Sequence, residues 1–120
     1  MVAPADNPTA KPAARRWTYD PEVLTVGTKR YLYFGSYFGG VFVRRLSTDG
    51  LSSVASTEKR ISIANRYEGT NIVRHGGWYY FLGSATDCCA SALTGYSVFA
   101  ARSRSPVSYT HLTLPTILRV

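Results

Sequence analysis

Two acidic residues occupy matching positions of an internal repeat and could act together on one chemical bond. Residues 20–36 align without a gap on residues 68–84, so that Asp20 falls on Glu68. Two carboxyl groups that flank a glycosidic bond can share its hydrolysis, because one gives a proton to the leaving oxygen while another activates water or stabilises positive charge. A neighbouring negative charge helps the acid to keep its proton. The same carboxylates could instead only cap loops, and the spacing alone leaves both interpretations open.

The length of the repeat indicates which elements position these carboxylates. The offset between Asp20 and Glu68 is 48 residues, and units of about 40 to 50 residues built from short strands are typical of propeller blades. The first strand of each blade lines the central channel, so matching ends of successive first strands converge on one mouth of that channel. Asp20 and Glu68 are therefore expected to face the same volume.

The strand pattern follows the repeat and predicts an all-β fold. No window of ordinary helix length carries apolar residues at helical spacing, whereas short alternating runs are separated by glycine-containing turns. Four strands are expected in the first repeat and three in the second, at 22–26, 30–35, 40–46 and 60–64, then at 71–74, 78–83 and 96–101. Aligning Val41-Phe42 with Val98-Phe99 gives an offset of 57, which places nine extra residues between the second and third strands of the second repeat.

Composition argues against two classes of partner. The chain has 120 residues and a formal net charge of +7, but its basic residues are scattered among strand ends and turns and form no stripe or nucleic-acid motif. No apolar run approaches the roughly 20 residues that cross a bilayer. We therefore expect neither a nucleic-acid partner nor a membrane span.

The two ends of the chain differ from the repeat region. Residues 1–16 are rich in Pro and Ala and lack the apolar region of a signal peptide, which predicts an irregular lead-in. Val107 to Thr116 resembles the translation of a sequencing-library adapter, and a genuine strand is the alternative. We take residues 17–106 as the propeller region and residues 107–120 as a non-native tail.

The motifs of the propeller region, taken in order, resemble those of glycoside hydrolase family 43. These motifs are "YDPEVL", "RYLYFGSYFGGVFVRRLSTDGL", "YEGTNIV", "GGWYYFLGSATDCC" and "TGYSVFAARSRSP". The resemblance implies a five-bladed propeller that acts as an inverting glycosidase on arabinose- or xylose-containing plant polysaccharide. The pairing of "GSYFGG" with "DCC" is more similar to the arabinanase branch.

The same resemblance implies roles for the two carboxylates. Glu68, in the E-G pair, matches the general acid, and Asp20 matches the Asp that orients the acid and modulates its pKa. The sequence departs from the family pattern at Thr70, where Pro is common, and at Tyr19, where a hydrophobic residue usually precedes D-P. The catalytic base Asp is expected upstream of Met1, so we expect the chain by itself to be an inactive fragment.

Aromatic residues near the expected channel mouth are candidates for substrate contacts. Tyr37 and Phe38 follow the second strand of the first repeat, and sugar C–H faces pack well on aromatic rings. The aromatic residues within the strands are expected to pack between blades instead; they are Tyr31, Tyr33, Tyr79, Tyr80 and Phe81.

The cysteine pair predicts no metal site. A disulfide between Cys88 and Cys89 would be strained, because neighbouring Cα atoms lie about 3.8 Å apart, below the usual disulfide range, so free thiols and a vicinal disulfide both stay open. Metal ligation would need further ligands, and the two histidines, His75 and His111, lie in a turn and in the tail. We expect no cofactor in this fragment. The resemblance implies that the parent protein can hold a calcium ion in its channel through a histidine on a later blade.

Two other functional classes remain open. A noncatalytic carbohydrate-binding propeller would keep the aromatic residues and tolerate the loss of a carboxylate, whereas an interaction propeller of the WD type would show G-H and W-D signatures that are not found. The expected partner is a polysaccharide or oligosaccharide. The resemblance implies a secreted protein, and the residues decide neither between arabinan and xylan nor between endo and exo cleavage.

Overall fold

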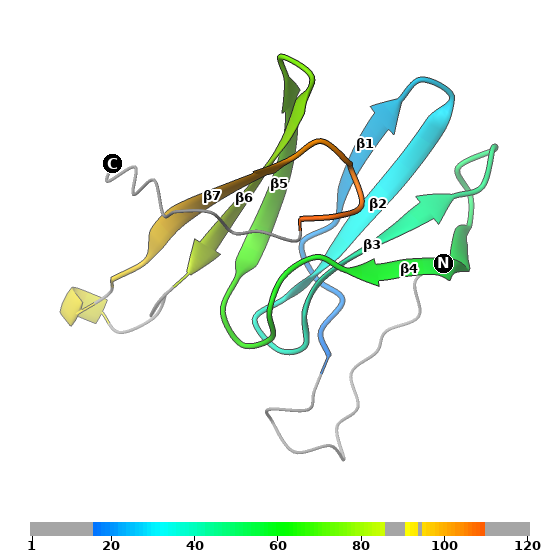
Figure 1. Ribbon diagram of the computed structural model, residues 1–120. Coiled ribbons are helices and arrows are strands. Elements are labelled where there is room, and N and C mark those ends of the chain that lie inside the picture. The colour runs from blue at the N-terminus through cyan, green and yellow to red at the C-terminus, as the bar shows by residue number, and fades with distance from the viewer. Residues whose placement is uncertain (1–15, 86–90, 94, 110–120) are drawn as a thin grey trace.

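The chain folds as two antiparallel sheets that stand side by side. The computed structural model describes residues 16–85, 91–93 and 95–109 (Figure 1). The first sheet has the order β1 (Glu22–Val26), β2 (Lys29–Ser36), β3 (Gly40–Leu46) and β4 (Ser53–Arg60). The second has the order β5 (Glu68–His75), β6 (Trp78–Ala85) and β7 (Ser97–Ser103), with the short 3-10 helix η2 (Ser91–Leu93) before β7. The prediction of an all-β chain is confirmed. None of the helices in the described part is both long and apolar enough to cross a membrane.

The fourth strand is the one whose predicted position is wrong. The sequence predicts a strand at 60–64 from the apolar residues Ile61 and Ile63, but β4 runs through the polar stretch Ser53–Arg60. A strand at the edge of a sheet can be polar because one of its sides faces water. Ile61 instead lies just beyond β4, where it is buried and its N–H donates to the Val41 carbonyl at 2.8 Å.

The strand register also corrects the alignment of the third strands. Gly35 pairs with Val41 on β3, whereas its repeat equivalent Gly83 pairs with Phe99 on β7. The offset between the third strands is therefore 58 rather than the predicted 57, and ten extra residues precede β7. The reason is that the Val-Phe match ignored which side of the sheet each residue faces.

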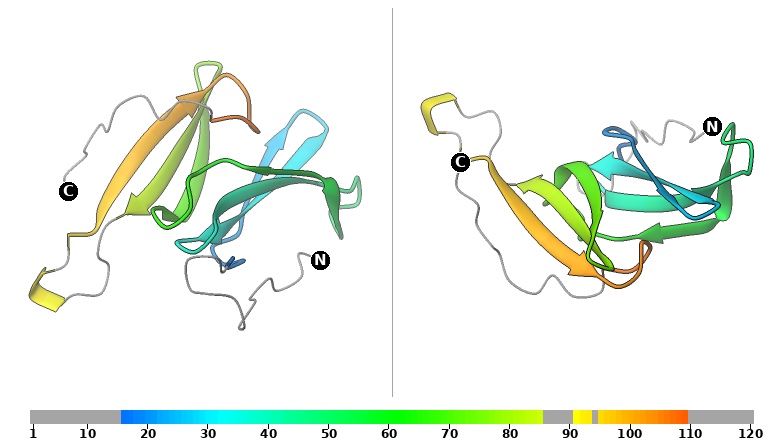
Figure 2. Two further views of the ribbon diagram at one scale, coloured as in Figure 1. Left: turned by 60° about the horizontal axis from the view of Figure 1, so that its bottom comes forward. Right: turned by 90° about the horizontal axis from the view of Figure 1, so that it is seen from above.

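The two sheets face each other side by side (Figure 2), and one hydrophobic cluster takes its buried residues from both. Tyr33 and Val43 of the first sheet, both 0% exposed, pack in one cluster with Phe81 of the second. The Tyr33 hydroxyl donates to the Pro106 carbonyl at 2.6 Å, and burial raises its pKa. Packing between the sheets is confirmed for four of the five strand aromatics, namely Tyr31, Tyr33, Tyr79 and Phe81. The fifth, Tyr80, points to the opposite face of β6 from its neighbour Tyr79.

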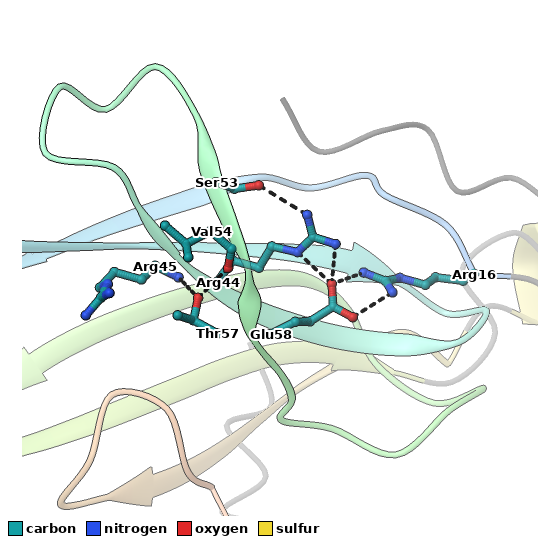
Figure 3. A network of polar contacts seen from close by, with 7 residues as sticks. All are labelled: Arg16, Arg44, Arg45, Ser53, Val54, Thr57 and Glu58. Atoms are coloured by element: carbon teal, nitrogen blue, oxygen red, sulfur yellow. Dashed lines mark hydrogen bonds and ion pairs between the residues drawn. The ribbon is translucent and has the colours of Figure 1, made fainter.

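An ionic network covers the other face of the first sheet. The two oxygens of Glu58 on β4 accept hydrogen bonds from Arg16 at 2.8 and 2.7 Å, and Arg44 on β3 donates to one of them at 2.7 Å (Figure 3). The Arg16 guanidinium also lies 3.9 Å from the centroid of the Phe42 ring. Hydrogen bonds, first from Arg16 and then from Arg44, hold the pKa of Glu58 below its usual value. The network shields the aromatic rings of this face from water.

Several predictions concern residues outside the described part of the chain. The lead-in up to residue 15, the tail from residue 110 and the pair Cys88-Cys89 all lie there. Of the predicted tail, the structure describes Val107 to Tyr109, and the Tyr109 ring contacts Phe81 with a centroid distance of 6.0 Å.

Candidate active site

The structure brings the two repeat carboxylates together where the sheets meet. Asp20 lies two residues before β1, and Glu68 is the first residue of β5. The Asp20 Oδ2 atom accepts a hydrogen bond from the Gly69 N–H at 2.9 Å, and two residues further along both segments the Asn71 amide donates to Glu22 Oε1 at 3.2 Å. These two contacts join the first strands of the two sheets at one end.

Local backbone geometry explains the pairing of Glu68 with a glycine. Gly69 has φ +60°, a conformation that a residue with a side chain adopts only with strain. The pairing of β5 with β6 shifts by one residue between Glu68 and Asn71, which is the mark of a β-bulge. Asp20 has φ +52°, a conformation that Asp tolerates better than most residues. Bulges re-aim side chains, and this one sets the direction of the Glu68 carboxyl.

Both oxygens of Glu68 contact hydroxyl groups. The Ser36 hydroxyl, at the end of β2, donates to Oε2 at 3.2 Å, and the Tyr96 phenol, just before β7, donates to Oε1 at 3.0 Å. Partial burial raises the pKa of Tyr96, a hydrogen bond from Ser84 lowers it, and the negative charges of Glu68 and Asp20 raise it further. The net effect is a raised pKa, so the phenol keeps its proton and acts as a donor at neutral pH.

Sequence reasoning did not select Ser36 or Tyr96 as site residues. One signal was available, because Ser36 and Ser84 are repeat equivalents and Ser84 pairs with Glu68 across the strands. Tyr96 stands in the G-Y-S motif, but its contact with Glu68 joins residues 28 positions apart and has no counterpart in local spacing.

The two carboxylates differ in the chemistry of their partners. Asp20 accepts from a backbone N–H, which can only donate and therefore favours an ionised carboxylate. Glu68 is held by hydroxyl groups, which can donate to a carboxylate or accept from a carboxylic acid. Asp20 is thus held by a group that can only donate, whereas Glu68 is held by groups that can donate or accept.

The predicted substrate contacts Tyr37 and Phe38 directly follow Ser36, whose hydroxyl donates to Glu68. Phe38 is half-buried and packs edge-on against Trp17 with a centroid distance of 4.6 Å, while Tyr37 is 38% exposed. Tyr19, which directly precedes Asp20 and was not predicted, is 50% exposed and lies 5.3 Å from the Trp17 ring. Substrate contact by Tyr37 and Phe38 stays a prediction.

Metal-ligating types of side chain do not cluster in the described part of the chain. In the described ranges, no three residues of the types His, Cys, Asp or Glu lie close enough together to hold an ion.

The chain was compared with known proteins. The model of glycosyl hydrolases family 43 matches residues 4–113. A probable arabinan endo-1,5-alpha-L-arabinosidase C of Aspergillus niger is 34% identical over 65 residues, which cover 51% of this chain and 20% of that protein. An exo-1,5-alpha-L-arabinanase from a bovine ruminal metagenomic library is 26% identical, with a TM-score of 0.69 over 76% of this chain and 32% of that chain. The alpha-L-arabinanase of Cellvibrio cellulosa complexed with arabinohexaose is 21% identical, with a TM-score of 0.67 over 82% of this chain and 36% of that chain.

These matches confirm the predicted fold class. The two sheets correspond to about two blades of a five-bladed β-propeller. The chain spans about a third of the length of these solved structures and a fifth of the curated relative.

Proposed function

Because the chain belongs to glycosyl hydrolases family 43, we propose that its whole protein hydrolyses O-glycosyl bonds of an arabinose-containing polysaccharide or oligosaccharide. The names of the similar proteins, an arabinosidase and two arabinanases, favour arabinose over xylose. The arabinohexaose in one of those structures favours a chain of sugars as the substrate.

The observation that carries the proposal is the setting of Glu68. Its carboxyl is held at both oxygens by hydroxyl groups, and the Asp20 carboxylate is bound to the very next residue. In the proposed mechanism Glu68 gives its proton to the oxygen of the leaving sugar. The charge of Asp20 favours the protonated form of Glu68, and its hydrogen bond to Gly69 steadies the bulge that aims it.

The proposed reaction inverts the configuration of the sugar and needs a second carboxylate that activates water. Inverting glycosidases place their acid and base about 6.5 to 9.5 Å apart. Asp20 is committed to a backbone N–H, and the other acids of the described residues serve elsewhere: Glu22 binds Asn71, Asp49 holds a turn and Glu58 pairs with arginines. We propose that the base comes from outside these residues.

Hydrolysis of linear arabinan and of xylan by the full-length protein tests the proposed function. We expect release of arabinose-containing products from arabinan and their loss in Glu68→Gln. Asp49→Asn is a matched control, because Asp49 is a carboxylate in an exposed turn that contacts Ser47 and Leu51. Binding of arabinan without hydrolysis by the wild type would favour the noncatalytic carbohydrate-binding propeller instead.

A further inference from the structure

We propose that Tyr96 is a positioning residue that fixes the proton of the Glu68 carboxylic acid on Oε2, beside Ser36. The inference rests on the proposed function in one respect, namely that Glu68 works as an acid. Its structural basis is the Tyr96 phenol, whose oxygen lies 3.0 Å from Oε1, and the Ser36 hydroxyl, whose oxygen lies 3.2 Å from Oε2.

The number of hydrogens that the Tyr96 hydroxyl can donate supports placing the acid proton on Oε2. A phenol has one hydrogen to donate. The Tyr96 phenol donates this hydrogen to Glu68 Oε1, with 3.0 Å between the two oxygens. An oxygen that already receives a hydrogen is a poor place for a second one. The acid proton therefore belongs on Oε2.

Ser36 can adapt to both protonation states of Glu68. When Glu68 is ionised, the Ser36 hydroxyl donates to Oε2, and when Glu68 is protonated the same hydroxyl can rotate and accept. Ser36 is 3% exposed, so water competes little for this contact. Tyr96 thus acts as a constant donor and Ser36 as an exchangeable partner.

The contacts also limit rotation of the carboxyl group. Ser36 belongs to the first sheet, whereas Tyr96 directly precedes β7 of the second. A carboxyl held from both sheets presents the same oxygen to a substrate each time, which keeps the proton transfer aligned. The charged groups that act on the phenol are Glu68 on β5 and Asp20 before β1, both negative.

The decisive experiment is a titration that does not depend on activity. The full-length protein is labelled with carbon-13 at glutamate carboxyl groups, and the Glu68 signal is assigned by its loss in Glu68→Gln. Tyr96→Phe removes a donor that binds the ionised carboxylate more strongly than the neutral acid, so the titration midpoint of Glu68 should move to higher pH. Ser36→Ala should move the midpoint in the same direction but less, because Ser36 also accepts from the protonated form.

Two outcomes would overturn the proposal: an unchanged midpoint in Tyr96→Phe, or a shift in Ser36→Ala that equals or exceeds it. Tyr80→Phe is the matched control, since Tyr80 pairs with Val73 and Arg102, away from the end of β6 that pairs with Glu68, and the Glu68 midpoint in this variant should equal that of the wild type. Thermal unfolding of each variant shows that the fold is kept.

Kinetics supply the second readout. In Tyr96→Phe we expect kcat on arabinan to fall about tenfold with KM unchanged, the size of effect that follows from losing one charge-assisted hydrogen bond in an aligned proton transfer. The basic limb of the pH–rate profile should move to higher pH together with the titration midpoint. If the wild type has no hydrolase activity, the proposed function fails while the titration still decides the role of Tyr96.

Discussion

The two sheets are copies of one repeat, yet they treat the matching carboxylate differently. In the first sheet, Asp20 is bound to a backbone N–H of the second. In the second sheet, Glu68 is bound by hydroxyl groups from both sheets. The difference shows that position in the repeat brings a carboxylate to the place where the sheets meet, whereas the partners found there can differ: a backbone N–H for Asp20 and hydroxyl groups, which can donate or accept, for Glu68.

The outer faces of the two sheets differ in a parallel way. Arg44 on β3 and Arg102 on β7 are equivalents at the corrected offset of 58. Arg44 pairs with Glu58 of β4, whereas the Arg102 guanidinium lies 4.4 Å from the centroid of Trp78, which Arg104 also approaches, at 3.8 Å. In the part of the chain that the structure describes, no carboxylate forms an ion pair with Arg102 or Arg104. In the four-stranded first sheet, β4 thus supplies the negative charge that pairs with Arg44.

Removing the acid should have the largest effect. In the full-length protein, Glu68→Gln should lower kcat on arabinan about 10²- to 10⁴-fold, because the leaving oxygen loses its proton donor. The loss should be much smaller on aryl arabinosides whose leaving group needs little protonation. Steady-state kinetics on both substrates measures this difference, and equal losses would remove Glu68 from the role of acid.

Removing the charge of the other repeat carboxylate should have a smaller effect. Asp20→Asn keeps an oxygen that can accept from the Gly69 N–H but loses the negative charge beside Glu68. Activity should fall about tenfold to a hundredfold, and the basic limb of the pH–rate profile should move to lower pH because the protonated form of Glu68 is less favoured. This direction is opposite to that expected for Tyr96→Phe, and a limb that stays in place would contradict the role of Asp20.

The ionic network of Arg16, Arg44 and Glu58 can be broken at Glu58, which both arginines bind. Glu58→Gln removes the charge that two arginines bind, and the free energy of unfolding should fall by about 1 to 2 kcal/mol at neutral pH. The folded-state pKa of Glu58 is lowered, so its stabilisation is complete above the ordinary Glu value and is lost as the pH falls through the folded value. Denaturant unfolding at neutral and acidic pH should show the difference from wild type shrinking with acid. Lys59→Gln, at the exposed neighbouring residue, should leave stability almost unchanged.

The smallest effect concerns a position where the repeats differ. Glu22 and Thr70 are equivalents, but Glu22 binds Asn71, whereas the Thr70 hydroxyl is buried and has no hydrogen-bond partner in the described structure. Thr70→Val keeps the shape and removes the unpaired polar atom, so it should raise the free energy of unfolding by about 1 kcal/mol. A shift of the denaturation midpoint to lower denaturant would show that the hydroxyl does have a partner.

The regular part of the fold could be read from the sequence because it depends on local alternation. β1 and β3 have the predicted bounds, and the 48-residue repeat brings Asp20 to Glu68. β4 was misplaced because an exposed edge strand carries no apolar signal. The partners of Glu68 were missed because they come from distant positions, and Arg16, assigned to the irregular lead-in, pairs with Glu58 across 42 residues. Such contacts depend on how the sheets pack, which no single segment encodes.

The hydrogen bonds around Glu68 connect the two sheets, so they depend on how one sheet is placed against the other. The Ser36 to Glu68 contact and the Asp20 to Gly69 contact both run between the sheets, so a slip of one sheet against the other lengthens them before any strand separates. On heating, the full-length protein should therefore lose activity before it loses its β-sheet circular dichroism. The reason is that the contacts between the sheets are lost before the strands within each sheet separate.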